Sequence, residues 1–288
     1  MNFVKEIVIS MRPKQWLKNA FVFAGLIFSK SFMDADQVVR TVFAFVLFSL
    51  LSGSVYIIND IVDKERDRLH PRKSSRPVAS GRLNANAALI CSLVLAAASL
   101  LLGFILDFGL FAVLGAYFLL VLGYSLKFKN YIIIDVILIA AGFVLRTVGG
   151  ALVIDVRISP WLLVCTTLLA LFIALNKRRS ELVVLSENAA GHRRILEEYT
   201  PELIDRMLSV VTSTTVMAYS LYTFNAGKSY YMMLTIPFVL YGIFRYQYLA
   251  SKGDLGGSPE LALLKDRPLF VNVALWVISS IVIVALFF

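Results

Sequence analysis

Nine strongly apolar runs divide this chain, and they constrain its fold more than any other feature. A helix needs about 20 predominantly apolar residues to cross a bilayer, and the sequence is 59% hydrophobic and only 16% charged. The pattern predicts an all-helical, polytopic membrane protein with about nine transmembrane helices in a single domain over residues 1–288. The first run is short, so we expect eight or nine spans. The runs lie near residues 16–29, 38–58, 85–106, 108–124, 132–153, 159–176, 208–225, 230–249 and 269–287.

Lys and Arg residues gather in alternate loops. If the N-terminus and every second loop share one side, 22 of the 28 basic residues fall on that side. Because cytoplasmic loops of membrane proteins carry an excess of Lys and Arg, we expect a cytoplasmic N-terminus and an external C-terminus in the inner (plasma) membrane. This topology explains the net charge of +9. No basic domain concentrates that charge, so we expect no nucleic-acid partner.

A polar segment follows the second run and reads Asn59-Asp60-Ile61-Val62-Asp63-Lys64-Glu65-Arg66-Asp67. Residues three, four and seven apart share a helix face, so a helix continuing out of the apolar run would present the amide and the three Asp side chains together. Such hard oxygen ligands suit Mg²⁺, which completes its shell with water and substrate phosphates. The segment therefore predicts a diphosphate site that faces the cytoplasm. The alternative is a solvated helix end with accidental spacing.

Cations crowd the loop after this segment, where Lys73 and Arg76 precede Pro77. Arg offers planar, bidentate donors to phosphate oxygens, and cations stabilise a diphosphate as it departs. We therefore expect Lys73 and Arg76 to bind substrate. The alternative is that these cations only set the orientation of the protein in the membrane.

A second polar group surrounds the start of the fifth run. Tyr124 can reach a phosphate through its hydroxyl, and Lys129 can supply a point charge. Arg146 lies about three helical turns beyond Asp135, and a charge at that depth must face protein or a wet cavity. We expect Arg146 to bind substrate, although Asp135 and Arg146 could each pair with a neighbouring helix instead. The dipeptide Gly149-Gly150 predicts close helix packing.

A third group closes the sixth run. We expect Lys177 and Arg178 to be exposed loop cations that hold a substrate phosphate, with Glu181 as an ion-pair partner or a further metal ligand. Near the start of the chain, the segment Arg12-Pro13-Lys14-Gln15-Trp16-Leu17-Lys18-Asn19 is amphipathic. It contributes Lys18 as a candidate substrate ligand, unless the segment serves only as a membrane anchor.

The spacing Asn59-Asp60-x-x-Asp63-x-x-x-Asp67 after a second span resembles the first signature of the UbiA superfamily of intramembrane prenyltransferases. The resemblance implies helices arranged around a central cavity. It also implies that Asn59, Asp63 and Asp67 bind Mg²⁺, or Mn²⁺ in its place, with a diphosphate donor, and that Asp60, Asp63 and Asp67 are catalytic. The superfamily's second Asp-rich motif is missing here, and Lys177-Arg178-x-x-Glu181 takes its place.

This departure resembles one branch of the superfamily, the decaprenyl-phosphate phosphoribosyltransferases. The branch resemblance implies transfer of 5-phosphoribose from 5-phosphoribosyl 1-diphosphate to a polyprenyl phosphate, for arabinan (arabinogalactan) precursors of the cell wall. The features that carry it are Arg12-Pro-x-Gln15-Trp16-x-Lys18-Asn19, His70-Pro71-x-Lys73-x-x-Arg76-Pro77, Tyr124 with Lys129, and Arg146. The expected substrate-binding residues are Lys18, Lys73, Arg76, Tyr124, Lys129, Arg146, Lys177, Arg178 and Glu181.

The residue types suit this chemistry. Displacing diphosphate from an anomeric carbon passes through an oxocarbenium-like state, so stabilising the departing charge matters most. A polyprenyl phosphate is already anionic, which removes the need for a general base. Two rival functions are a UbiA-type prenyltransferase acting on an aromatic or quinone precursor, which the missing second Asp motif disfavours, and a secondary transporter, which the lack of an internal repeat disfavours. The oligomeric state stays open, a homo-oligomer included.

Overall fold

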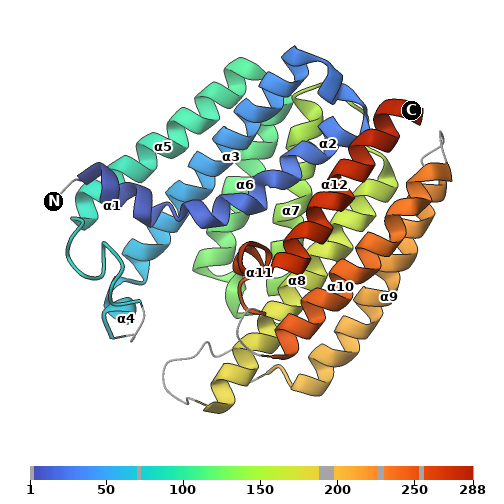
Figure 1. Ribbon diagram of the computed structural model, residues 1–288. Coiled ribbons are helices and arrows are strands. Elements are labelled where there is room, and N and C mark those ends of the chain that lie inside the picture. Colours follow the sequence, from blue (N-terminus) through green and yellow to red (C-terminus); the bar gives the residue numbers. More distant parts are fainter. Residues whose placement is uncertain (1–2, 70–72, 188–197, 226–229, 253–255, 288) are drawn as a thin grey trace.

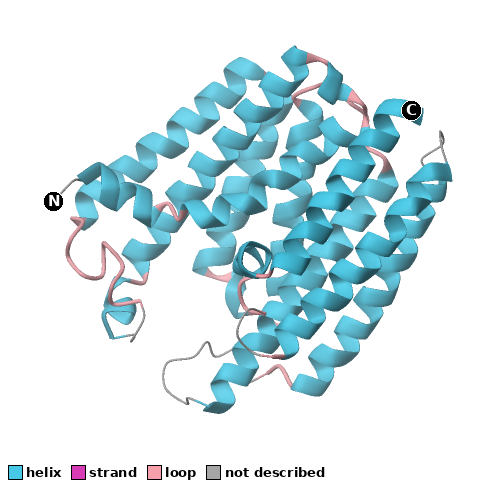
Figure 2. Cartoon of the chain, viewed as in Figure 1, coloured by secondary structure: helices cyan, strands magenta, loops and turns pink. Residues whose placement is uncertain are grey.

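The computed structural model describes residues 3–69, 73–187, 198–225, 230–252 and 256–287 (Figure 1). Within these ranges the chain forms helices and loops and no strand, so the all-helical prediction is confirmed (Figure 2). The long helices lie side by side in one bundle. They are α3 (Ala35–Val62), α5 (Ala85–Leu106), α6 (Phe108–Leu126), α7 (Ile134–Leu152), α8 (Pro160–Glu187), α9 (Pro201–Asn225), α10 (Ile236–Ser251) and α12 (Arg267–Phe287).

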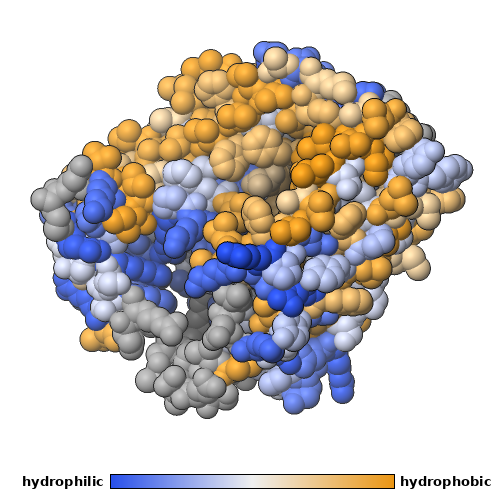
Figure 3. Space-filling model, viewed as in Figure 1, coloured by the Kyte–Doolittle hydropathy of each residue, from blue (hydrophilic) through white to orange (hydrophobic). Residues whose placement is uncertain are grey.

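The helices match the apolar runs of the sequence in order. Among the described residues, six helices are long and apolar enough to cross a membrane: α3, α5, α6, α7, α8 and α12. The three remaining predicted positions are taken by α9, by η1 (Pro13–Val22) with α2 (Phe23–Phe28), and by η5 (Tyr230–Thr235) with α10. Figure 3 shows apolar residues over the upper part of the visible face and polar residues over the lower part. The chain is a multi-pass membrane protein.

The first span is not one α-helix. Its first ten residues form the 3₁₀ helix η1, which α2 continues. This segment lies very close to α7, because a Cβ atom built at Gly150 would fall 1.9 Å from the carbonyl oxygen of Val22. Helix α3 is also close to α7, because a Cβ atom built at Gly149 would fall 2.8 Å from the ring of Phe48. The prediction of close helix packing at these two glycines is confirmed.

Two helix ends differ from the expectation. The acidic segment does not continue one helix, because α3 ends at Val62, Asp63 caps it, and α4 (Lys64–Leu69) follows. Asp competes for backbone hydrogen bonds and therefore favours helix ends over helix interiors. By contrast, α8 runs on to Glu187 instead of stopping near residue 176, since the added Lys, Arg, Glu and Leu residues are good helix formers.

Two further short helices pack on the elements already described. Helix α1 (Phe3–Ser10) packs on α3 at the N-terminal edge, and α11 (Pro259–Lys265) lies between α10 and α12. Helix α11 also contacts η1. The last and first parts of the chain thereby meet at the same end of the bundle as the acidic segment.

Candidate active site

Two buried carboxylates of the acidic segment are held by two arginines. Arg76 Nη1 donates to Asp60 Oδ1 at 3.1 Å and to Asp67 Oδ2 at 2.6 Å, while Arg12 Nη2 also donates to Asp60 Oδ1. The Asp60 and Asp67 side chains are only 2% and 4% exposed. The guanidinium of Arg12 also lies over the ring of Tyr56, 5.0 Å from its centroid. This ion-pair network joins α3, α4, the loop after α4 and the turn before η1.

Asp63 points toward a different cation. Its Oδ2 atom lies 3.8 Å from Lys129 Nζ, on the short helix η3 (Phe128–Asn130), and both side chains are partly exposed. The N–H of Asp63 donates to the carbonyl of Asn59 at 2.9 Å, which keeps these two residues one turn apart. The structure therefore brings the predicted substrate ligand Lys129 to the predicted metal ligand Asp63.

The predicted metal ligands fit Mg²⁺ only in combination with a substrate. In the part of the chain that the structure describes, no three His, Cys, Asp or Glu side chains are grouped to hold a metal ion. Mg²⁺ usually takes one or two carboxylates and completes its shell with water and substrate phosphates. Asp63 and Asp67, with the amide oxygen of Asn59, offer a donor set of that kind.

A second wall of the site comes from η1 and α11. Glu260 Oε1 accepts a hydrogen bond from Gln15 Nε2, and Glu260 Oε2 lies 3.6 Å from Lys18 Nζ. Lys18 also donates to Gln15 Oε1. The charges of Arg12 and Arg146 act on Lys18, so this wall shares an electrostatic environment with the acidic segment.

Sequence reasoning missed Tyr56 and Glu260 as site residues, and it noted Arg12 and Gln15 without assigning either a role. One signal for Glu260 was available in the sequence. It is a carboxylate between two apolar spans, and it directly follows Pro259, the first residue of α11. Its partner in η1 could not be read from the sequence.

Arg146 is buried inside the bundle and fully engaged. It donates to Asn19 Oδ1 at 2.6 Å, to the Gly142 carbonyl at 2.7 Å and to the Tyr117 hydroxyl at 2.7 Å. The alternative that Arg146 pairs with neighbouring helices is therefore confirmed. Through Asn19 it braces η1 against α6 and α7, and its predicted contact with substrate stays a prediction.

The expectation that Arg178 is an exposed loop cation is wrong. Because α8 extends past residue 176, the guanidinium of Arg178 lies inside the protein, where it donates to Asp135 Oδ2 at 2.6 Å, to Tyr124 Oη at 2.9 Å and to Glu181. The side chains of Arg178 and Asp135 are both 0% exposed. Asp135 thus has the partner in a neighbouring helix that one reading of the sequence proposed.

Tyr199 completes the surroundings of Asp135. Its hydroxyl donates to Asp135 Oδ1 at 2.7 Å and accepts from the Ile133 N–H at 2.8 Å. Burial, followed by the hydrogen bond to Asp135, raises the pKa of Tyr199 above its usual range. The hydroxyl therefore stays protonated and keeps donating at physiological pH.

The remaining predicted residues lie around these groups. Lys177 is half-buried on α8, and Lys73 is exposed in the loop after α4. His70 and Pro71 of the predicted motif lie outside the described residues. The structure thus gathers the predicted residues into two groups, one on α3, α4, η1 and η3 and one around Arg178, with Arg146 deeper in the bundle.

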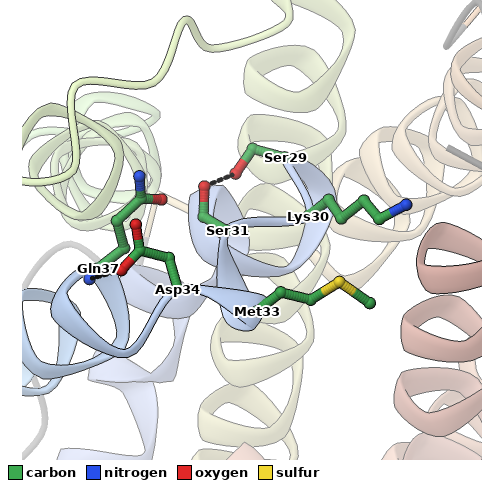
Figure 4. Close-up of a pocket in the computed structure, with 6 residues that line it drawn as sticks. All are labelled: Ser29, Lys30, Ser31, Met33, Asp34 and Gln37. Carbon is green, nitrogen blue, oxygen red and sulfur yellow. Dashed lines mark hydrogen bonds between the residues drawn. The ribbon is translucent and has the colours of Figure 1, made fainter.

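A shallow pocket at the other end of α3 does not belong to this site. Asp34 caps the first residue of α3 there, whereas Asp60 lies near its last. The hydroxyls of Ser29 and Ser31 lie 2.7 Å apart in this pocket (Figure 4). Its lining residues are Ser29, Lys30, Ser31, Met33, Asp34 and Gln37.

Sequence and structure comparisons place the chain among known proteins. The sequence profile of the UbiA prenyltransferase family matches residues 19–272. A decaprenyl-phosphate phosphoribosyltransferase of Corynebacterium glutamicum is 31% identical, over 98% of this chain and 88% of the relative. The enzyme of the same name from Mycolicibacterium smegmatis is also 31% identical, over 96% of this chain and 91% of the relative.

A solved structure shares the fold. The UbiA homologue of Archaeoglobus fulgidus, bound to DMAPP and Mg²⁺, superposes with a TM-score of 0.73 over 98% of this chain and 99% of its own, at 18% identity. With the profile match and the full-length relatives, this likeness shows that the chain belongs to the UbiA prenyltransferase family.

Proposed function

We propose that this protein transfers 5-phosphoribose from 5-phosphoribosyl 1-diphosphate to a polyprenyl phosphate and releases diphosphate. The reaction requires Mg²⁺, with Mn²⁺ as a substitute, and takes place at the cytoplasmic face of the inner membrane. The full-length relatives that carry the name decaprenyl-phosphate phosphoribosyltransferase support this proposal. The distribution of basic residues supports the orientation.

The observation that carries the proposal is the set of charged residues on α8. The UbiA resemblance leads us to expect a second Asp-rich motif there. Arg178 occupies that position, and it forms ion pairs with both Asp135 and Glu181. The described carboxylates that we assign to a metal are therefore those of the acidic segment, Asp63 and Asp67. The second phosphate of the donor needs a cation at this end of the site, and we assign that role to Lys177, which is half-buried on α8; this favours phosphoribosyl diphosphate over a prenyl diphosphate.

The site supplies the parts that this transfer needs. The bond between the anomeric carbon and the diphosphate oxygen breaks, and the acceptor phosphate oxygen forms the new bond to that carbon. Arg76 and Lys129, which pair with carboxylates of the acidic segment, are the cations that we assign to the departing diphosphate. When bound, Mg²⁺ adds positive charge at the same oxygens. The polyprenyl tail remains among the apolar helices.

Purified protein in lipid nanodiscs tests the proposal. We expect incorporation of radiolabelled phosphoribose into lipid when the protein receives Mg²⁺, phosphoribosyl diphosphate and polyprenyl phosphate. A parallel reaction contains geranyl diphosphate and hydroxybenzoate. Efficient prenyl transfer there, with no reaction from phosphoribosyl diphosphate, refutes the proposal in favour of an aromatic prenyltransferase.

A further inference from the structure

Glu260 leaves one buried oxygen without a hydrogen bond. The residue is 5% exposed, and its Oε1 atom accepts from Gln15. Its Oε2 atom is inaccessible and has no hydrogen-bond partner among the described residues, although Lys18 Nζ lies 3.6 Å away. A buried acceptor in this state is costly. A ligand that brings a hydrogen-bond donor would relieve that cost.

The 3₁₀ winding of η1 connects this oxygen to the acidic segment. In a 3₁₀ helix, residues three apart lie in line, with a rise of about 6 Å per turn. The N–H of Gln15 donates to the carbonyl of Arg12 at 2.8 Å, so Arg12, Gln15 and Lys18 follow one another at this spacing. Arg12 contacts Asp60, whereas Gln15 and Lys18 contact Glu260. The contacts of Glu260 therefore lie about one turn of η1 from the contact of Arg12 with Asp60.

Packing places Glu260 on the same side. Its helix α11 contacts η1, and Arg12, which directly precedes η1, lies over the ring of Tyr56. The group next to the diphosphate in the proposed donor is the ribose, which carries two hydroxyl donors. A prenyl diphosphate offers only carbon and hydrogen at that place, and it would leave the oxygen unpaired.

We infer that Glu260 accepts a hydrogen bond from a ribose hydroxyl of the donor and selects the sugar diphosphate against a prenyl diphosphate, with Gln15 and Lys18 holding the carboxylate in position. This inference rests on the proposed function. A site built to bond a hydroxyl strongly rejects an analogue that lacks it, because the protein's own polar group is then left unpaired.

The test compares enzyme variants on the natural donor and on donor analogues that each lack one hydroxyl. The value of kcat/KM is measured for phosphoribosyl diphosphate and for its 2-deoxy and 3-deoxy analogues, in wild-type protein and in Glu260→Leu and Glu260→Gln. We expect wild-type protein to prefer the natural donor over at least one deoxy analogue by about ten- to hundredfold, the scale of a hydrogen bond to a charged group. In Glu260→Leu this preference should fall to within about twofold.

Glu6 provides a matched control. It is also 5% exposed, and its Oε2 atom also lacks a hydrogen bond, but it lies on α1 beside Arg82, whose side chain is 41% exposed. Glu6→Leu should retain the wild-type preference between donors. Calorimetric binding of the donor with Mg²⁺, in the absence of acceptor, should show the same pattern as kcat/KM.

Each result decides the question. A preference that is unchanged in both Glu260 variants overturns the inference, and so does a loss that is equal for natural and deoxy donors. A shift in the Mg²⁺ concentration for half-maximal activity, with the donor preference intact, would make Glu260 a metal ligand instead. Wild-type protein that transfers no phosphoribose removes the proposed function itself, which is a distinguishable failure.

Discussion

Arg178 and Arg179 are adjacent on α8, yet the structure predicts very different consequences for their loss. Arg178→Met removes the ion-pair partner of the fully buried Asp135, which keeps the hydrogen bond from the Tyr199 hydroxyl. Removing one partner of a buried ion pair costs roughly 3–5 kcal/mol. Arg179 pairs with Asp205 at 2.6 Å, but these side chains are 31% and 49% exposed. Arg179→Met should therefore cost about 1 kcal/mol or less.

A double-mutant cycle measures the buried pair directly. Asp135→Asn keeps an acceptor for Tyr199 and leaves Arg178 with Glu181, so it should cost less than Arg178→Met. The double variant should be more stable than the sum of the two single effects predicts, by about 2 kcal/mol. The assay is chemical unfolding in detergent micelles, followed by circular dichroism.

Two outcomes would refute this reasoning. The first is an equal, small loss of stability in Arg178→Met and Arg179→Met. The second is strict additivity in the cycle, which would mean that Arg178 and Asp135 do not depend on each other. Transfer activity per folded molecule, measured on the same samples, separates a structural role of Arg178 from the substrate contact predicted from the sequence.

Three further predictions concern the metal, the packing and the acceptor. Asp63→Ala and Asp67→Ala should each lower turnover at least about a hundredfold, and excess chelator should abolish transfer by wild-type protein; near-normal turnover in chelator contradicts both. Gly150→Ala should destabilise the fold by about 1–3 kcal/mol because of the contact with Val22, while Gly115→Ala, whose new Cβ meets no neighbouring element within 4 Å, should unfold at the wild-type temperature or above it, since Ala favours a helix interior over Gly. Removing the acceptor's phosphate should abolish transfer, whereas each methylene lost from its tail should weaken binding by about 0.8 kcal/mol; transfer to the free alcohol would overturn this.

The apolar runs alone predicted the order and positions of the long helices, because a bilayer imposes both a length and an internally bonded backbone on whatever crosses it. The break of the first span into η1 and α2 was not predictable in this way. It depends on how closely Val22 approaches Gly150 of a distant helix. Hydropathy does not distinguish a 3₁₀ from an α-helix.

The acidic segment was recognisable because hard oxygen ligands at a membrane boundary are rare and expensive. The ion-pair partner of each charged residue was not recognisable, because these partners lie far away in the sequence. Asp60 is 48 residues from Arg12, and Arg178 is 43 residues from Asp135. A run of Lys and Arg after an apolar segment looks like an exposed loop until the length of α8 is known.

The ion pairs suggest different roles for Asp60 and Asp67, although both contact Arg76. Asp60 is also held by Arg12, a residue that adopts the left-handed conformation with φ of 55°. That conformation costs about 1–2 kcal/mol for a residue with a side chain, and the contact with Asp60 offsets it. If Arg76 turns toward a diphosphate, Asp60 keeps its charge partner. Asp67 would then lose the ion pair that the structure gives it and present a bare carboxylate. Asp67 is therefore the acid that suits a metal, whereas Asp60 suits a fixed anchor for the two arginines.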